Sequence, residues 1–425
     1  MNRLLFSLIA ILATANIFAA DKTITVKLSN PMSVARHAVP VVISVDNDVC
    51  SALVTIDGKE IPCQLDDMND DGLFEELSFV VDMKKKEKLT ATVTLSTEGE
   101  PRQYDAKTYG ALAIRDRDKS AKTQKHMPIT SVTCPASSNT YQYIFPHGAI
   151  MESDMVGFRV YADHRQSIDY YGHKQLKCDI AETSFYPTKE QKAAGSGDDV
   201  LYTGTTYGCG ALHGWDGKTA VMFENVRNRT YTVVTSGPVR TVVDITNRGW
   251  QPQKDCKSVD IRTRYILYAG HRDVEVDVKF SRPVADIPLS TGIVDIVEGS
   301  EEFTDKAGLR GCWGTACAGN NPKVYDTHTV GLGVYVPKQY YKSDSHFTDK
   351  DATPAPKIPN QAYAQVVGTT TDHLNYWFAV TCDMECFSLS GESALDSAQP
   401  SKDAWFAWLK QWKQQLSAPV SVVLN

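Results

Sequence analysis

The sequence lacks the short motifs of several common enzyme classes. It has no glycine-rich phosphate-binding loop, no G-x-S-x-G turn and no H-E-x-x-H pair, which disfavours nucleotide-binding, serine-hydrolase and zincin chemistry. The ten cysteines include no C-x-x-C pair and their spacings do not repeat, so a cysteine-based zinc site is not expected. No cofactor for catalysis is predicted.

The chain also lacks an excess of positive charge. It has 44 Lys and Arg against 51 Asp and Glu, a formal net charge of -7, whereas a nucleic-acid-binding surface needs clustered basic residues. The run Lys84–Lys86 is followed by Glu87 and is interpreted as a solvated hairpin turn. A nucleic-acid partner is therefore not expected.

Long apolar runs are absent except at the N-terminus. Residues 1–3 carry a positive charge, residues 4–18 are almost all apolar, and two alanines precede Asp21. This order is typical of a secretory signal peptide. We expect it to span residues 1–20 and to direct export to the periplasm or the cell exterior. Because no later segment reaches ~18 consecutive apolar residues, the mature chain is not expected to enter a membrane.

Several cysteines lie close together in the sequence, and an exported chain permits disulfides. The close pairs are Cys50/Cys63, Cys312/Cys317 and Cys382/Cys386. Local disulfides and buried free thiols are both open interpretations, because spacing alone does not separate them.

Helical periodicity is scarce, while alternation of apolar and polar residues recurs throughout the chain. Five alternating runs within residues 21–100 predict a small β-sandwich of immunoglobulin-like size. The alternation continues through residues 107–425 with no intervening helices, which predicts one large antiparallel β-sandwich. Residues 401–416 are the exception, since Ser401 is a suitable N-cap and one apolar stripe follows. The predicted class is all-β with a C-terminal helix.

The stretch His147–Lys174 is the most polar part of the chain. Its run "GFRVYADHR" alternates strictly, so Phe158, Val160 and Ala162 should face the core. The opposite face then carries a polar row of Arg159, Tyr161, Asp163 and Arg165. Arginine and tyrosine suit recognition of a saccharide or carboxylate, which favours a groove on this face. A plain solvated face is the alternative.

Acid/base chemistry has candidates in the same stretch. His147 titrates near neutral pH, and Glu152, Asp163 and Tyr161 are further candidates for proton transfer. A structural role for His147 is the competing interpretation.

A second cluster lies in the glycine-rich segment Gly204–Lys218. Tyr207, His213 and Trp215 occur there in a predicted loop, where an exposed indole would suit stacking on a sugar ring. The alternative is a hairpin turn in which Trp215 is a buried plug.

The segment "DDMNDDG" resembles the first half of a calcium-binding loop. Asp67, Asn69, Asp71 and Gly72 match D-x-N-x-D-G, but Ser78 stands where the closing glutamate is expected. A shorter loop closed by Glu75 gives a structural Ca²⁺ site, and a plain Asp/Asn/Gly hairpin turn is the alternative.

These motifs together resemble a known family. The blocks "HGAIMESDMVGFRVYADHRQSIDYYGHK", "GDDVLYTGTTYGCGALHGWDG" and "DDMNDDGLFEELSFVVDM" are similar to the secreted bacterial proteins grouped as domain of unknown function 4861. The resemblance implies exported polysaccharide processing on a galactose-mutarotase-like β-sandwich, without an established mechanism. The matching positions offered as site candidates are His147, Glu152, Arg159, Asp163, Arg165, Asp169 and Tyr171.

The leading hypothesis is an exported enzyme that acts on uronate-containing oligosaccharides. Arg159 and Arg165 would bind the sugar carboxylate or hydroxyls, and the bond would break by hydrolysis, which needs two carboxylates, or by elimination, which needs a base and a neutralised uronate. A non-catalytic glycan-binding protein and a sugar mutarotase or isomerase are the alternatives. The oligomeric state is not determined by the sequence.

Overall fold

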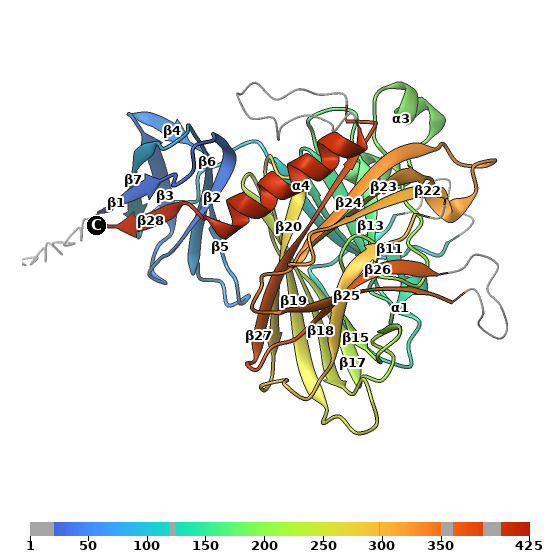
Figure 1. Ribbon diagram of the computed structural model, residues 1–425. Coiled ribbons are helices and arrows are strands. Elements are labelled where there is room, and N and C mark those ends of the chain that lie inside the picture. The colour runs from blue at the N-terminus through green and yellow to red at the C-terminus, as the bar shows by residue number, and fades with distance from the viewer. Residues whose placement is uncertain (1–20, 119–124, 297, 350–359, 386–400) are drawn as a thin grey trace, which may run out of the picture.

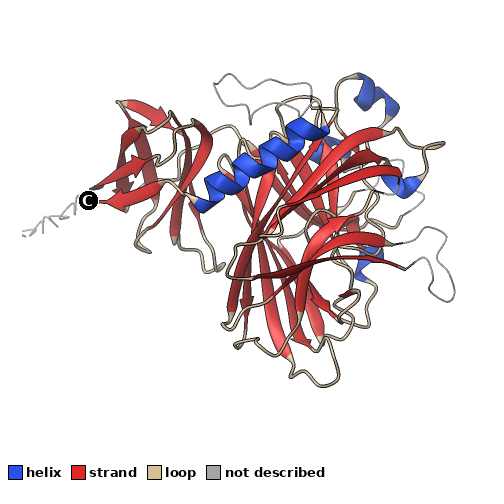
Figure 2. Ribbon diagram, in the orientation of Figure 1, coloured by secondary structure: helices blue, strands red, loops and turns tan. Residues whose placement is uncertain are grey.

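Alternating strands form almost the whole chain. The computed structural model describes residues 21–118, 125–296, 298–349, 360–385 and 401–425, so the predicted signal peptide lies outside the described residues. Figure 2 shows sheets in both halves of the molecule and one long helix. The predicted all-β class with a C-terminal helix is confirmed.

The small module at the blue end of Figure 1 is a sandwich of two sheets. Its five-stranded sheet has the order β28 (Ser421–Leu424), β1 (Lys22–Ser29), β7 (Lys88–Ser96), β3 (Ser51–Ile56) and β4 (Lys59–Ile61). Its three-stranded sheet has the order β2 (Arg36–Ser44), β6 (Glu76–Met83) and β5 (Cys63–Asp66). The last strand of the predicted 107–425 unit thus pairs with β1 of the small module.

The large module is built on a nine-stranded antiparallel sheet. Its order is β10 (Ser131–Pro135), β17 (Asn228–Ser236), β18 (Arg240–Trp250), β19 (Val259–Tyr268), β20 (Asp273–Phe280), β27 (His373–Cys382), β24 (His328–Tyr335), β23 (Leu309–Ala316) and β22 (Glu298–Thr304). One face of this sheet is covered by two smaller sheets, and the main apolar core lies between the layers.

The first of these smaller sheets has six strands and carries the polar stretch found in the sequence. Its order is β14 (Asp198–Asp199), β13 (Ile168–Gly172), β12 (Val156–Tyr161), β11 (Ile144–Ser153), β8 (Thr108–Ile114) and β9 (Met127–Pro128). The second has the order β16 (Ala220–Val221), β15 (His213–Trp215), β21 (Leu289–Val294), β26 (Gln361–Val367) and β25 (Tyr341–Thr348).

Helix α4 (Lys402–Ser417) covers the other face of the nine-stranded sheet and runs toward the small module (Figure 1). Ser401 caps it, as predicted, by accepting a hydrogen bond from the backbone N–H of Ala404 at 3.3 Å. Leu409 packs directly on Gly311 and Gly333, a cross-strand pair of β23 and β24. A Cβ at either glycine would collide with Leu409, so these glycines let the helix approach the sheet closely.

The remaining helices are short. They are α1 (Thr140–Tyr143), α2 (Ile180–Thr183), α3 (Lys189–Ala193) and a 3₁₀ turn at Ala318–Asn320. Within the described ranges, no helix combines the length and apolarity that a membrane crossing requires.

The cysteine pairs can be partly resolved. Cys50, Cys63 and Cys312 are free thiols, so neither of the first two close pairs is bridged. Cys386 lies outside the described residues, which leaves the third pair as a prediction.

A buried ion pair joins the two modules. The Arg240 guanidinium of β18 contacts Asp66 of β5, with Nη2 2.7 Å from Oδ2 and both side chains almost fully buried. Glu76 of β6 lies 2.5 Å from the same nitrogen but is partly exposed. Gln64 adds a hydrogen bond from its amide to the Arg240 carbonyl and accepts from the Val239 backbone N–H. The side chains of Gln64 and Asp66 on β5 therefore hold the small module against the start of β18, where Arg240 lies.

Substituting Asp66 tests this junction. We expect Asp66→Ala to lower the free energy of unfolding by about 3–5 kcal/mol, because it leaves the buried guanidinium without its main partner. Glu76→Ala is the matched control and should cost at most about 1 kcal/mol, since a half-exposed pair is screened by water. Urea unfolding followed by circular dichroism measures both, and equal losses would contradict the assignment.

Candidate active site between the two modules

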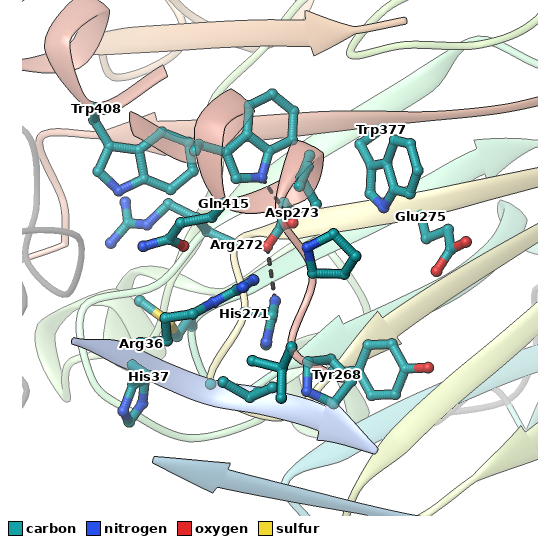
Figure 3. A pocket seen from close by; sticks show the side chains of 18 of the residues that line it. Arg36, His37, Tyr268, His271, Arg272, Asp273, Glu275, Trp377, Trp408 and Gln415 are labelled. Carbon is teal, nitrogen blue, oxygen red and sulfur yellow. Dashed lines mark hydrogen bonds and ion pairs between the residues drawn. The ribbon is translucent and has the colours of Figure 1, made fainter. Parts of the chain in front are cut away.

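A cavity of about 390 Å³ lies where the small module, the nine-stranded sheet and helix α4 meet. Figure 3 shows Arg36 entering it from β2 of the small module, while Asp273 and Glu275 enter from the sheet side. Trp377 of β27 and Trp408 and Trp412 of α4 supply its aromatic walls. All three structural units contribute side chains, so the cavity exists only in the assembled fold.

The acidic residues reach the cavity because β20 alternates. Val274, Val276 and Val278 are fully buried in the main core, which turns Asp273, Glu275 and Asp277 to the opposite face. Like charges along one face of a strand repel one another, so this row needs compensating partners or protons.

Asp273 is held ionised by two donors. His271 Nδ1 lies 2.8 Å from Asp273 Oδ1, and the indole N–H of Trp412 donates to Oδ2 at 2.9 Å. His271 Nε2 faces the Ala38 carbonyl at 2.8 Å, so both ring nitrogens meet acceptors and the ring is a protonated imidazolium. Burial alone would raise the pKa of Asp273, but His271 and Trp412 hold it below its usual value.

Glu275 has the opposite environment two residues further along. Burial, followed by repulsion from Asp277 and Asp273, raises the pKa of Glu275 to about 7. Its carboxyl remains partly accessible from the cavity. Two neighbouring carboxyl groups with pKa values pushed apart are typical of acid/base sites, and Glu275 is the one that can exchange a proton near neutral pH.

The aromatic wall contains one accessible ring. Trp377 is the cross-strand partner of Glu275 and is only half-buried, whereas Trp408 and Trp412 are buried against the sheet. Tyr335 stacks behind Trp377 with ring centroids 6.2 Å apart. Trp377 is therefore a fixed apolar platform beside the titrating carboxyl, which suits stacking on a sugar ring.

Arg36 supplies positive charge to the cavity. One of its nitrogens donates to the Ala418 carbonyl at 2.9 Å, and no carboxylate in the described part of the chain forms an ion pair with it. Burial lowers the pKa of Arg36, which nearby Asp273 partly offsets. The guanidinium is available to an anionic ligand, to which it can donate in a bidentate manner.

The polar row predicted on β12 does not line this cavity, and part of it is buried. Phe158 and Val160 are fully buried on the core side of β12, so its facing follows the predicted alternation. Arg159 is only 2% exposed, however, and bonds to Asp169, Tyr161 and Tyr186. Its guanidinium also lies 4.2 Å from the centre of the Phe185 ring, so the segment after β13 covers this part of the row rather than leaving a groove.

Asp199 of β14 completes this buried cluster. Burial and then repulsion from Asp169 raise the pKa of Asp199 well above its usual value. Arg159 forms ion pairs with both carboxyl groups, Asp169 and Asp199. These contacts account for Arg159, Asp169 and Tyr161 as a cross-strand packing network.

His147 lies at the exposed end of the row. It stacks on Tyr141 with ring centroids 4.1 Å apart, and its Nδ1 donates to the Tyr141 carbonyl at 2.8 Å. Burial, together with Arg115 and two other arginines, lowers the pKa of His147. Arg165 packs on the same tyrosine and pairs with Asp163 at 2.7 Å.

A second cavity, of about 520 Å³, opens beside this end of the row. Tyr141, Asp163, His164 and Glu224 contribute to its lining. The structure thus brings His147, Asp163, Arg165 and Tyr161 into one neighbourhood, as the sequence predicted.

Glu152 does not belong to that neighbourhood. In the register of β11 and β12, Gly148 lies opposite Tyr161 and Glu152 opposite Gly157. His147 and Glu152 are therefore five residues apart along the strand, roughly 16 Å. The predicted acid/base pair of these two residues is not formed, and Glu152 is fully buried with Tyr171 nearby in the same sheet.

The glycine-rich cluster lies in the core. Tyr207 and His213 are fully buried with stacked rings 5.2 Å apart, and Trp215 is almost fully buried. Burial lowers the pKa of His213 to about 4. All three residues therefore pack in the core, as the alternative interpretation predicted for Trp215, and none of them offers a ring to a ligand at the surface.

The predicted calcium loop is an exposed turn. The Asp67 carboxylate accepts hydrogen bonds from the backbone N–H groups of Asn69, Asp70, Asp71 and Gly72. Glu75 accepts from the Asn69 side chain at 2.8 Å. Carboxylate oxygens of Asp67, Asp71 and Glu75 lie within 4.8 Å of one another, so the calcium site stays a prediction beside a turn that already satisfies Asp67.

Comparison with known proteins settles the family. The sequence profile described as "Domain of unknown function (DUF4861)" matches residues 28–422. The chain belongs to the DUF4861 family. This confirms the resemblance drawn from the polar blocks of the sequence. No curated protein matches this DUF4861 chain.

Two solved structures give distant likenesses. A protein in the glycosyl hydrolase family 38 from Enterococcus faecalis has 10% identity and a TM-score of 0.44 over 95% of this chain and 47% of its own. An alpha-mannosidase from Enterococcus faecalis V583 has 10% identity and a TM-score of 0.42, over 95% and 46%. The DUF4861 chain spans about half the length of these proteins, and likenesses this distant carry no argument about its activity.

The sequence contained a usable sign of the cavity. Three acidic residues at alternate positions of "DVEVDVKF" face one way, which is costly for an ordinary solvated strand. The sequence around Arg36 gave no sign that this residue reaches the cavity, because Arg36 lies in the small module, far from β20 along the chain. Its approach to β20 depends on the junction at Arg240.

The raised pKa of Glu275 predicts a pH-dependent stability. The folded state keeps the proton to about pH 7, whereas the unfolded state releases it near its ordinary value. The carboxyl group therefore costs stability as pH rises between these values. Relative to Glu275→Gln, we expect the free energy of unfolding of the wild type to fall by about 2 kcal/mol over this pH range. Each pKa unit is worth ~1.4 kcal/mol, and partial exposure of the carboxyl group reduces the full effect through screening by water.

Urea unfolding of the two proteins at a series of pH values measures this difference. It should be small at acid pH, grow toward neutral pH and then level off. A difference that stays constant across this range would show that Glu275 titrates normally.

Proposed function

We propose that the protein is an exported carbohydrate-active enzyme that cleaves uronate-containing oligosaccharides in the cavity between its modules, with Glu275 as the acid/base group. The observation that carries the proposal is the position of Glu275 in the cavity beside the partly exposed ring of Trp377, where burial raises the pKa of its carboxyl group to about 7. A general acid or base works best when its pKa is close to the working pH.

Two further side chains fit a uronate. Trp377 offers its face to the apolar side of a sugar ring. Arg36 has no carboxylate partner among the described residues and would bind the uronate carboxylate at the same cavity. The export prediction and the polysaccharide context implied by the family resemblance agree with a substrate of this class.

The environments of the two carboxyl groups favour elimination over hydrolysis. Hydrolysis needs a second carboxylate that is free to act on water or on the sugar, but both oxygens of Asp273 already accept hydrogen bonds. Elimination needs one base and a cation. Ionised Glu275 would remove the proton next to the uronate carboxylate, a carbon–carbon double bond would form, and the glycosidic C–O bond at the β-carbon would break. The departing oxygen would take up a proton from water and leave as the hydroxyl group of the released sugar. Arg36 would stabilise the charge that develops on the carboxylate.

The pH profile separates the two reactions. With oligouronides from pectin, glycosaminoglycans and algal polysaccharides, elimination predicts a rate that rises with pH through about 7, because the base must be ionised. Hydrolysis with Glu275 as general acid predicts the reverse. Ultraviolet absorbance detects the new double bond, and a reducing-sugar assay without that absorbance detects hydrolysis.

Variants of the cavity test the assignment. Glu275→Gln should lower kcat about 10²–10⁴-fold, and Arg36→Met should raise KM about tenfold or more. Asp277→Asn is the matched control on the same strand face. It should keep the maximal rate but move the pH midpoint downward, because Asp277 helps to raise the pKa of Glu275.

Two outcomes would redirect the proposal. Loss of activity in His147→Gln with full activity in Glu275→Gln would place the reaction at the polar row. Binding of oligouronides without any product would favour the glycan-binding alternative.

A further inference from the structure

The outer face of the six-stranded sheet holds a second polar cluster, separate from the cavity. Glu152 of β11, His173 just after β13, and Asp179 just before α2 each offer one ligand atom, and these atoms lie within 4.8 Å of one another. The three residues are 0%, 1% and 3% exposed. Residues 27 positions apart in the sequence thus place two carboxyl groups and an imidazole in one dry site.

The cluster is organised, yet it has unused polar atoms. Glu152 Oε1 accepts from the backbone N–H groups of Asp179 and Ile180, at 2.7 and 3.0 Å. Asp179 Oδ2 accepts from the Gly197 N–H at 2.9 Å. The other oxygens, Glu152 Oε2 and Asp179 Oδ1, and both ring nitrogens of His173 are buried without a hydrogen-bond partner. Backbone donors therefore fix one oxygen of each carboxyl group, while the second oxygen of each has no hydrogen bond.

His173 also lies beside Glu152. Its Nε2 is 3.0 Å from Glu152 Oε1, the oxygen that already accepts from the backbone N–H groups of Asp179 and Ile180. The second oxygen, Glu152 Oε2, therefore remains for a further ligand.

The charge balance points the same way. No lysine or arginine of the described chain pairs with Glu152 or Asp179, so the His173 imidazole is the basic group shown beside these two buried carboxyl groups. Two carboxyl groups buried with so little compensating charge are costly. A divalent cation would satisfy the charge and the open atoms together.

We infer that Glu152, His173 and Asp179 bind one divalent transition-metal ion, with Zn²⁺ the expected occupant. The imidazole favours zinc over calcium or magnesium, which prefer all-oxygen sites. The backbone N–H groups bond to the carboxylate oxygens that would not bind the metal, and such outer hydrogen bonds are usual for metal-binding carboxylates. Full burial gives the ion a structural role. It fastens the segment from His173 to Gly197, which covers the Arg159 cluster, onto the sheet. The inference does not depend on the proposed function.

Metal content tests the site in the mature full-length chain. Protein stripped with a chelator, reloaded with Zn²⁺ and freed of excess metal by gel filtration should hold one zinc per chain by mass spectrometry. His173→Gln and Asp179→Asn should hold almost none. Asp71→Asn, in the exposed acidic turn, and His346→Gln, in a partly exposed pair with Asp295, are matched controls and should keep the full content. Saturating Zn²⁺ should raise the Tm of the wild type by about 5 °C.

Cobalt loading of the wild type removes dependence on the folding of the variants. One equivalent of Co²⁺ should give visible absorption and an X-ray absorption spectrum with oxygen and a single imidazole as ligands. A wild-type chain that retains neither zinc nor cobalt overturns the inference. So does a folded His173→Gln chain that retains a full equivalent of zinc.

Discussion

Arg240 places its charge in a largely buried junction, and the carboxylates around it come from the other module. A guanidinium in this position is tolerated only while Asp66 stays beside it, so the pair restricts how the small sandwich can sit on β18. Arg36 is carried by that sandwich, and its distance from β20 is set by the same junction. The composition of the cavity thus follows from an ion pair that is not part of it.

The cavity illustrates how one strand gives two carboxyl groups different chemistry. Asp273 and Glu275 face the same way, two residues apart, and both are partly exposed. His271 and the indole of Trp412 stabilise charge on Asp273, whereas burial and repulsion from Asp277 and Asp273 outweigh the attraction of Arg240 and His373 and raise the pKa of Glu275. Helix α4 takes part in this division, because Trp412 reaches Asp273 only when Leu409 is seated on Gly311 and Gly333.

Much of the fold was predictable from local pattern. Alternation identified the strands of both modules, and Ser401 with its apolar stripe identified α4. The facing of Phe158 and Val160 followed from the same rule. What alternation does not encode is the layer that packs on the other face, so Arg159 was expected in a groove but lies beneath Phe185 and Tyr186.

The site was harder to predict because its parts are far apart in the chain. The nearness of His147 to Arg165 and Asp163 could be inferred in part. His147 lies on β11 close to the end of β12, and Asp163 and Arg165 follow in the bend after β12, which ends at Tyr161 rather than continuing to Arg165. The separation of His147 from Glu152 required the register of β11, which residue types alone do not give. Arg36 and Glu275 are brought together only by tertiary packing across the junction.

The pairing of β28 with β1 has a consequence for the order in which the protein is made. Strand β1 begins at Lys22, but its neighbour on one side spans Ser421–Leu424, so almost the whole chain is synthesised between them. The small sandwich therefore exposes an open strand edge while the large module forms, and such an edge invites pairing with other chains. The five-stranded sheet of the first module can be completed only after the whole chain has been synthesised, and α4, which lines the cavity, directly precedes β28 in the sequence.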